Sequence, residues 1–77
     1  MATADKDLLL QQAHRLAALG LVVERERSKL KTLVERGVSY DDPDMLQVLE
    51  RFRAADFEWK QLEIEHLQLR QTLGLEL

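Results

Sequence analysis

One short segment interrupts the helix-forming sequence of this chain and limits the folds available to it. The segment is GVSYDDP, residues 37–43. Gly37 follows an apolar-periodic run and can adopt the left-handed conformation in which helices commonly end. Asp42 before Pro43 is typical of a helix start, because Asp caps the first turn and a proline at the first helical position loses no hydrogen bond. The sequence therefore predicts an all-α fold, an antiparallel hairpin of two helices. The predicted elements are a first helix at about 5–36, a loop at 37–42 and a second helix at about 43–73.

The size of the chain favours a single domain that needs further stabilisation. The chain has 77 residues and no cysteine, so disulfides and thiolate metal sites are excluded. A chain of this length buries only about 60% of the surface that its unfolded form exposes, and its core rarely supplies more than ~3–5 kcal/mol. Oligomerisation is the remaining common remedy. We expect residues 1–77 to form one helical-hairpin domain that associates with a protein partner.

Charge and hydropathy predict a soluble cytoplasmic protein without membrane or nucleic-acid partners. No apolar run approaches the ~18 residues of a membrane span, and the acidic start MATADKDLLLQQ lacks the basic region of a signal peptide. The net charge is −3, which gives no general attraction to nucleic acid. Glutamates lie among and around the basic residues between 25 and 31, and no aromatic residue lies between them for base stacking. We therefore expect a salt-bridged surface there.

Both predicted helices carry a heptad pattern of apolar residues, as coiled coils do. If the numbers of paired residues add up to 78, the two apolar seams face each other and the turn is centred on Ser39, within the predicted loop. This register pairs Gln12 with His66, so we expect these two polar side chains to bond to each other and to fix the register. The seam positions are Leu9, Gln12, Leu16, Leu19, Val23, Glu26, Leu30 and Leu33 in the first helix, and Met45, Val48, Phe52, Ala55, Trp59, Leu62, His66, Leu69 and Leu73 in the second.

Further apolar residues lie outside the seam, mainly at the end of the hairpin away from the loop. Two helices cannot enclose a core, because each has only one neighbour. The sequence therefore predicts that another protein surface covers these residues, either a second copy in a four-helix bundle or a different helical protein. The predicted interface residues are Leu10, Ala17, Leu21, Phe57, Ile64 and Leu67.

These features predict a small non-catalytic protein–protein interaction module, such as an adaptor, a chaperone-like protein or a regulatory subunit, without a cofactor. The overall plan is similar to the hairpin co-chaperones of type III secretion needle subunits. That resemblance rests on size and helix pattern over most of the chain, and it implies a chaperone-like role.

The main alternative function depends on His14. The stretch AHRLAALG (13–20) resembles the phosphorylated helix of histidine phosphotransfer domains, and a dimeric hairpin could form the four-helix bundle that those domains use. Leu16 fits their pattern, whereas Ala17 and Ala18 stand where Lys and Gly are usual. The resemblance implies a phosphotransfer or phosphatase-like regulator that works as a dimer.

Two other patterns point to chemistry. The stretch DDPDMLQVL is similar to the same region of small sporulation phosphatases, which are also two-helix hairpins. Leu49 and Arg53 stand where that family has a paired Ser and Asp, so no catalytic residue carries over.

Glu63 and His66 have the Glu-x-x-His spacing of di-metal bundles. The facing stretch 8–23 contains no Asp or Glu to complete such a site, so we predict that no metal is bound.

Overall fold

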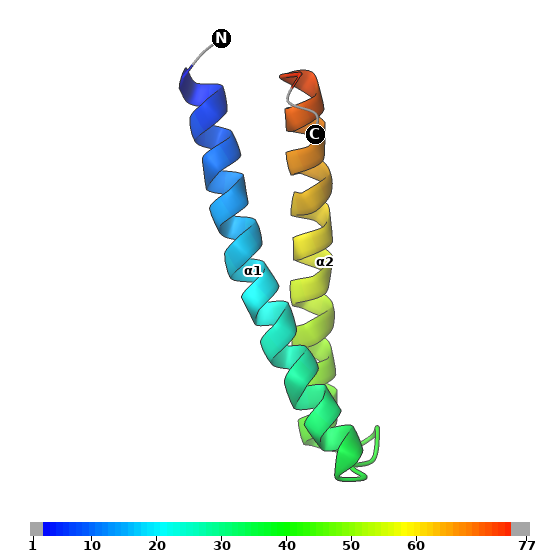
Figure 1. The fold of residues 1–77 in the computed structure, drawn as a ribbon. Helices are drawn as coiled ribbons and strands as arrows, with labels where there is room; N and C mark the ends of the chain where they lie inside the picture. Colours follow the sequence, from blue (N-terminus) through cyan, green and yellow to red (C-terminus); the bar gives the residue numbers. More distant parts are fainter. Residues whose placement is uncertain (1–2, 75–77) are drawn as a thin grey trace.

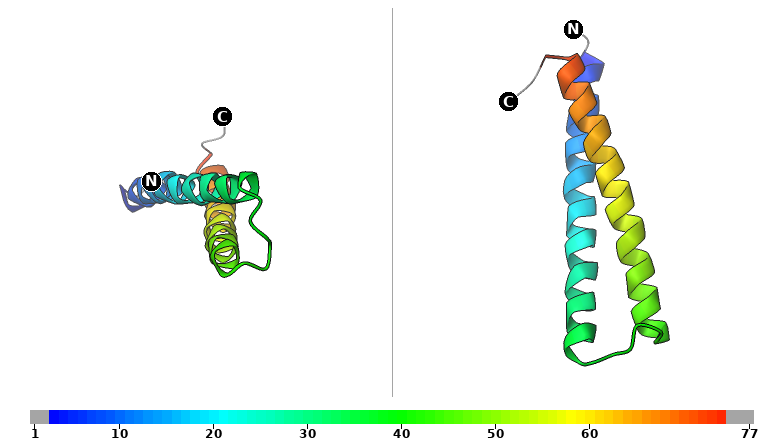
Figure 2. Two further views of the ribbon diagram at one scale, coloured as in Figure 1. Left: turned by 90° about the horizontal axis from the view of Figure 1, so that it is seen from below. Right: turned by 90° about the vertical axis from the view of Figure 1, so that its right-hand side faces the viewer.

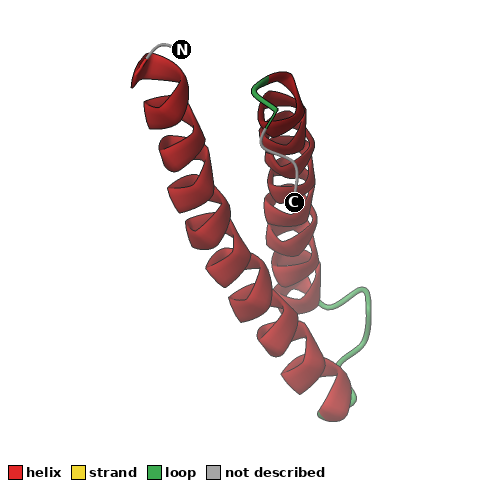
Figure 3. Ribbon diagram, turned by 45° about the horizontal axis from the view of Figure 1, so that its top comes forward, coloured by secondary structure: helices red, strands yellow, loops and turns green. Residues whose placement is uncertain are grey.

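The computed structural model describes residues 3–74 and shows a hairpin of two long helices (Figure 1). Helix α1 spans Thr3–Glu35 and helix α2 spans Pro43–Thr72. The residues described contain helices and loops and no strand, as Figure 3 shows. The predicted all-α hairpin is confirmed. Helix α1 begins two residues before the predicted start, and Asp5 lies in its first turn, where a carboxylate interacts favourably with the helix dipole.

The ends of the helices at the loop are defined by the predicted capping residues. Gly37 has a φ of 74°, its N–H bonds to the carbonyl of Val34, and the N–H of Val38 bonds to the carbonyl of Leu33. These two bonds form a Schellman motif, which satisfies carbonyls that a helix end would otherwise leave free. At the start of α2, the carboxylate of Asp42 accepts a hydrogen bond from the N–H of Asp44, with Pro43 at the first helical position.

The seam between the helices follows the predicted register. All the predicted seam residues between Leu9 and Leu73 are buried or half-buried. Nδ1 of His66 and Oε1 of Gln12 are 3.0 Å apart, so this predicted polar pair is confirmed. Nδ1 donates this bond, because Oε1 is an acceptor.

The most buried residues lie in the half of the hairpin nearer the loop. We define this loop half as residues 23–55 and the open half as the described residues on either side of it. Met45 has no exposed surface, and Val23 and Ala55 are also buried. Between residues 5 and 22 and between 56 and 74, the seam residues are only half-buried. The core of the hairpin therefore lies in the loop half.

The molecule is an elongated rod whose Cα atoms extend over 54 × 20 × 15 Å. In Figure 1 the helices are apart at the open end and close together near the loop. In the right-hand view of Figure 2, which is turned by 90°, they overlap at the open end and are apart near the loop. The two views together show that the helices wind around each other, as expected for a heptad pattern. Within residues 3–74 neither helix has an apolar stretch long enough to cross a bilayer.

Candidate protein-interaction face

The six predicted interface residues are all exposed, with Leu21 at 69% and Phe57 at 65%. An apolar side chain alone at the surface is ordinary, but several that are aligned on both helices of a small protein indicate an interaction site. We call this set the apolar face. It consists of Leu10, Ala17, Leu21, Phe57, Ile64 and Leu67.

Helical periodicity explains why these side chains do not reach the seam. They occupy the second and sixth positions of each heptad, which point sideways and away from the partner helix, whereas the first and fourth positions pack in the seam. The fifth positions of the two helices flank the seam on the same side of the hairpin. Gly20 and Arg27 of α1 line one hollow there together with Asp56 and Trp59 of α2. Leu10, Ala17 and Leu67, at the second heptad positions, lie next to these fifth positions.

The opposite side of the hairpin is more polar. In the open half it has a hollow lined by Arg15, Glu58 and Glu65, and Nη2 of Arg15 lies 3.7 Å from Oε2 of Glu58. Phe57 also borders this hollow. The aromatic ring of Phe57 therefore lies at the outer edge of the apolar face and not at its centre.

Two further exposed apolar residues continue the apolar face towards the loop. Val34, at a fifth heptad position, and Leu46, at a second position, are about half exposed. Neither is among the six predicted interface residues, which lie nearer the open end. The signal that could have found them is their heptad position, which is on the same side of the hairpin as Leu10 and Leu67.

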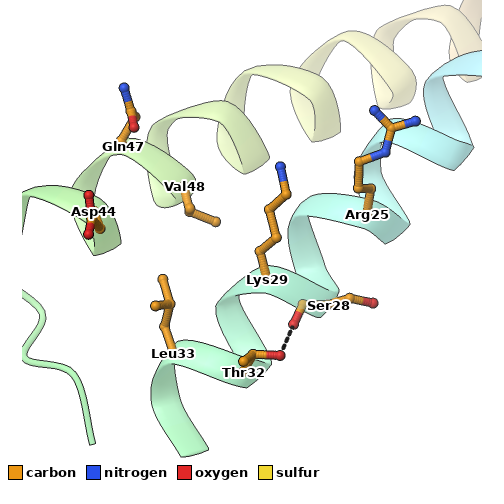
Figure 4. A pocket seen from close by; sticks show the side chains of 8 residues that line it. All are labelled: Arg25, Ser28, Lys29, Thr32, Leu33, Asp44, Gln47 and Val48. Atoms are coloured by element: carbon orange, nitrogen blue, oxygen red, sulfur yellow. Dashed lines mark hydrogen bonds between the residues drawn. The ribbon is translucent and has the colours of Figure 1, made fainter. Parts of the chain in front are cut away.

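A hollow of about 630 Å³ forms an open groove between the helices in the loop half (Figure 4). Leu33 and Val48 point towards each other across it, and Arg25 and Lys29 line its α1 side. Asp44 lies on the opposite wall, so the charges in the groove are mixed. The hydroxyl of Thr32 donates a hydrogen bond to the carbonyl of Ser28 in its own helix.

The basic cluster of α1 forms salt bridges within its own helix. Arg27 pairs with Glu24 at 3.0 Å and Lys29 with Glu26 at 3.2 Å. The predicted salt bridges are confirmed for these two pairs, and Arg27 also lies over the ring of Phe52.

Glu26 differs from the solvated charge expected in this cluster. It is only 6% exposed, and its Oε2 has no hydrogen-bond partner among the described residues, while its Oε1 binds Lys29. The heptad position of Glu26 explains its burial, because the fourth position of a heptad packs in the seam. A buried carboxylate with one free oxygen weakens the hairpin.

The candidate phosphotransfer and metal-site residues, His14, Glu63 and His66, do not form a common site. His14 is exposed on α1 and has no hydrogen bond or ion pair with any described residue. His66 is occupied by Gln12, while Glu63 of the Glu-x-x-His motif is exposed. Among residues 3–74 no group of three or more metal-ligating side chains is close enough to hold a metal ion.

Comparison with known proteins does not assign the chain to a family. No protein-family model, no curated protein and no solved structure matches it. The function is therefore inferred from the geometry of the apolar face.

Proposed function

We propose that this protein is a small non-catalytic interaction module that works through the apolar face. The observation that carries the proposal is the exposure of all six of its residues in the open half of a two-helix rod. Burial of a large apolar side chain contributes about 1.5–3 kcal/mol. Covering several of them would stabilise a hairpin whose own core is small.

The total exposed area supports a protein partner of ordinary size. The chain exposes 5917 Å². A compact monomer of the same mass would expose about 4,900 Å², roughly 1,000 Å² less. A stable protein–protein interface removes about 800 Å² from each partner. The excess surface of the hairpin therefore matches the area that one such interface covers.

A homodimeric four-helix bundle is the assembly that we propose for the isolated protein. A second copy offers a matching apolar face, and closed two-fold dimers are the commonest protein assemblies. In this form the module would serve as an adaptor, a chaperone-like protein or a regulatory subunit. A helical client or target would replace the second copy on the same face.

The proposal is tested by adding charge to the apolar face. Phe57→Glu/Ile64→Glu should raise the dimer dissociation constant at least about a hundredfold, because both carboxylates would have to be buried unpaired. The matched control is Gln61→Glu/Gln68→Glu, which adds the same charge to exposed positions of α2 outside the apolar face. Sedimentation equilibrium measures both constants, and circular dichroism reports helicity. Equal dissociation constants for the two variants would contradict the proposal.

A phosphotransfer or phosphatase-like regulator is the second candidate, and the exposure of His14 is the observation that favours it. In that case His14→Ala would abolish phosphoryl transfer without a change in helicity or mass. The test is incubation of the protein with acetyl phosphate or a phosphorylated response regulator, followed by intact-mass measurement. A phosphorylated wild type and an unmodified His14→Ala variant would support this candidate.

A further inference from the structure

We propose that the second copy packs with a two-fold axis along the length of the hairpin, so that both loops lie at the same end. Helix α1 of each copy then lies on α2 of the other. This inference rests on the proposed function, because it specifies how two copies cover the apolar face. It follows from the distribution of exposed apolar and charged residues along the two helices.

Residues of α1 and α2 lie at the same level of the rod when their numbers add up to about 78, as the bond between Gln12 and His66 shows. Exposed large apolar residues occur at three levels of α1, with Leu8 close to the level of Leu10. Three of the four exposed large apolar residues of α2 lie at nearly the same levels, and the fourth, Ile64, lies at the level of His14. From the open end to the loop, these levels hold Leu10 with Leu67, Leu21 with Phe57, and Val34 with Leu46.

Two copies can pack their apolar faces together with a two-fold axis along the rod or across it. Only one of these arrangements covers the exposed apolar residues at all three levels. A two-fold axis along the rod keeps each residue at its level, so that Val34 of one copy meets Leu46 of the second copy. An axis across the rod reverses the levels. When centred on the open half, it brings Leu10 against Leu21 of the second copy and leaves Val34 and Leu46 uncovered. The arrangement along the rod therefore buries more of the exposed apolar surface.

Charges between the apolar levels are complementary in the same arrangement. Glu24 and Arg53 occupy second heptad positions at one level, and both are exposed. Arg27 and Glu50 follow at the next level towards the loop. In the arrangement along the rod, Glu24 of one copy therefore faces Arg53 of the second copy, and Arg27 faces Glu50. Such a pattern favours one register and orientation over others.

The charges of α2 in the open half do not oppose this packing. Nζ of Lys60 lies 2.9 Å from Oδ2 of Asp56, so the two side chains form a pair within their own helix. At the same level, α1 carries Ala17 and Gly20, which leave room for the aliphatic stem of a lysine.

The test uses cysteine cross-linking, which is clean because the chain has no cysteine of its own. A mixture of Glu24→Cys and Arg53→Cys chains should form a disulfide-linked dimer about tenfold faster than either variant alone, owing to the high effective concentration of the two thiols. A mixture of His14→Cys and Ala17→Cys serves as the comparison, because only an axis across the rod brings those positions together. Faster cross-linking of this second mixture would overturn the inference while leaving the homodimer intact.

Charge reversal provides a second test whose outcome differs in sign between the arrangements. Glu24→Arg should raise the dissociation constant about three- to tenfold, and Glu24→Arg/Arg53→Glu should restore it. With an axis across the rod, Glu24 would lie beside Asp7 of the second copy, so Glu24→Arg would lower the constant instead. A monomeric wild type would overturn the homodimer together with this inference, whereas a dimer with tighter Glu24→Arg association would overturn the inference alone.

Discussion

The open and loop halves of the hairpin share one heptad pattern but differ in burial. In the loop half, Val23, Met45 and Ala55 are removed from solvent. In the open half the seam residues are only half-buried, and most of the exposed large apolar side chains lie there.

The residues that flank the seam explain the difference. In the loop half long side chains lie beside it, such as Arg27 over Phe52 and Lys29 next to Glu26, and their aliphatic stems cover apolar surface. On the fifth-position side of the open half, α1 has Ala13 and Gly20, and an added Cβ at Gly20 would lie 3.6 Å from Nε1 of Trp59. On this side, the short flanking residues leave the seam of the open half less covered than the seam of the loop half.

The largest change in the free energy of unfolding is expected in the loop half, where it tests whether the core of the hairpin lies there. Met45→Ala should lower the free energy of unfolding by about 2–4 kcal/mol, because it empties the most buried position of the hairpin. Gln47→Ala, an exposed neighbour in the same helix, should change it by less than about 0.5 kcal/mol. Urea denaturation followed by circular dichroism measures both. Similar small losses would show that the core does not lie near the loop.

A second change should strengthen the loop half. Glu26→Leu should raise the free energy of unfolding by about 1 kcal/mol, because it replaces a buried carboxylate that has an unpartnered oxygen with an apolar seam residue. Glu26→Gln, which keeps the shape and removes the charge, is the control and should give a smaller gain. A loss of stability in Glu26→Leu, measured by the same denaturation, would mean that the bond to Lys29 outweighs the cost of burial.

In the open half, the polar seam pair provides a comparable test. His66→Ala should lower the free energy of unfolding by about 1 kcal/mol, because Gln12 loses its partner in a half-buried position. Gln12→Leu/His66→Leu removes both partners and should be at least as stable as the wild type. If the double variant is instead the least stable, the pair contributes more to stability than a neutral hydrogen bond usually does.

The smallest effect is expected at His14. His14→Ala should leave helicity unchanged and should alter the dimer dissociation constant by no more than about twofold, since alanine is a good helix former. Light scattering over a dilution series measures the constant. Complete loss of association would show that His14 holds the two copies together.

The sequence predicted those features that depend on local chemistry and on the register. Gly37 and Asp42 define the loop through their own backbone preferences, and Gln12 meets His66 because the heptads fix which residues face each other. The burial of Glu26 was harder to predict, since its charged neighbours suggested a solvated surface although its heptad position is in the seam. The residue pattern of one chain carries no information about a second chain, so it predicts the apolar face and does not identify a partner.

The proposed homodimer is tested most directly by the solution mass of the wild-type chain, measured by light scattering together with circular dichroism. If a second copy covers the open half, the chain is a helical dimer with twice the chain mass of 9.0 kDa at micromolar concentration. A helical monomer at the same concentration would contradict the claim that a second copy covers the open half.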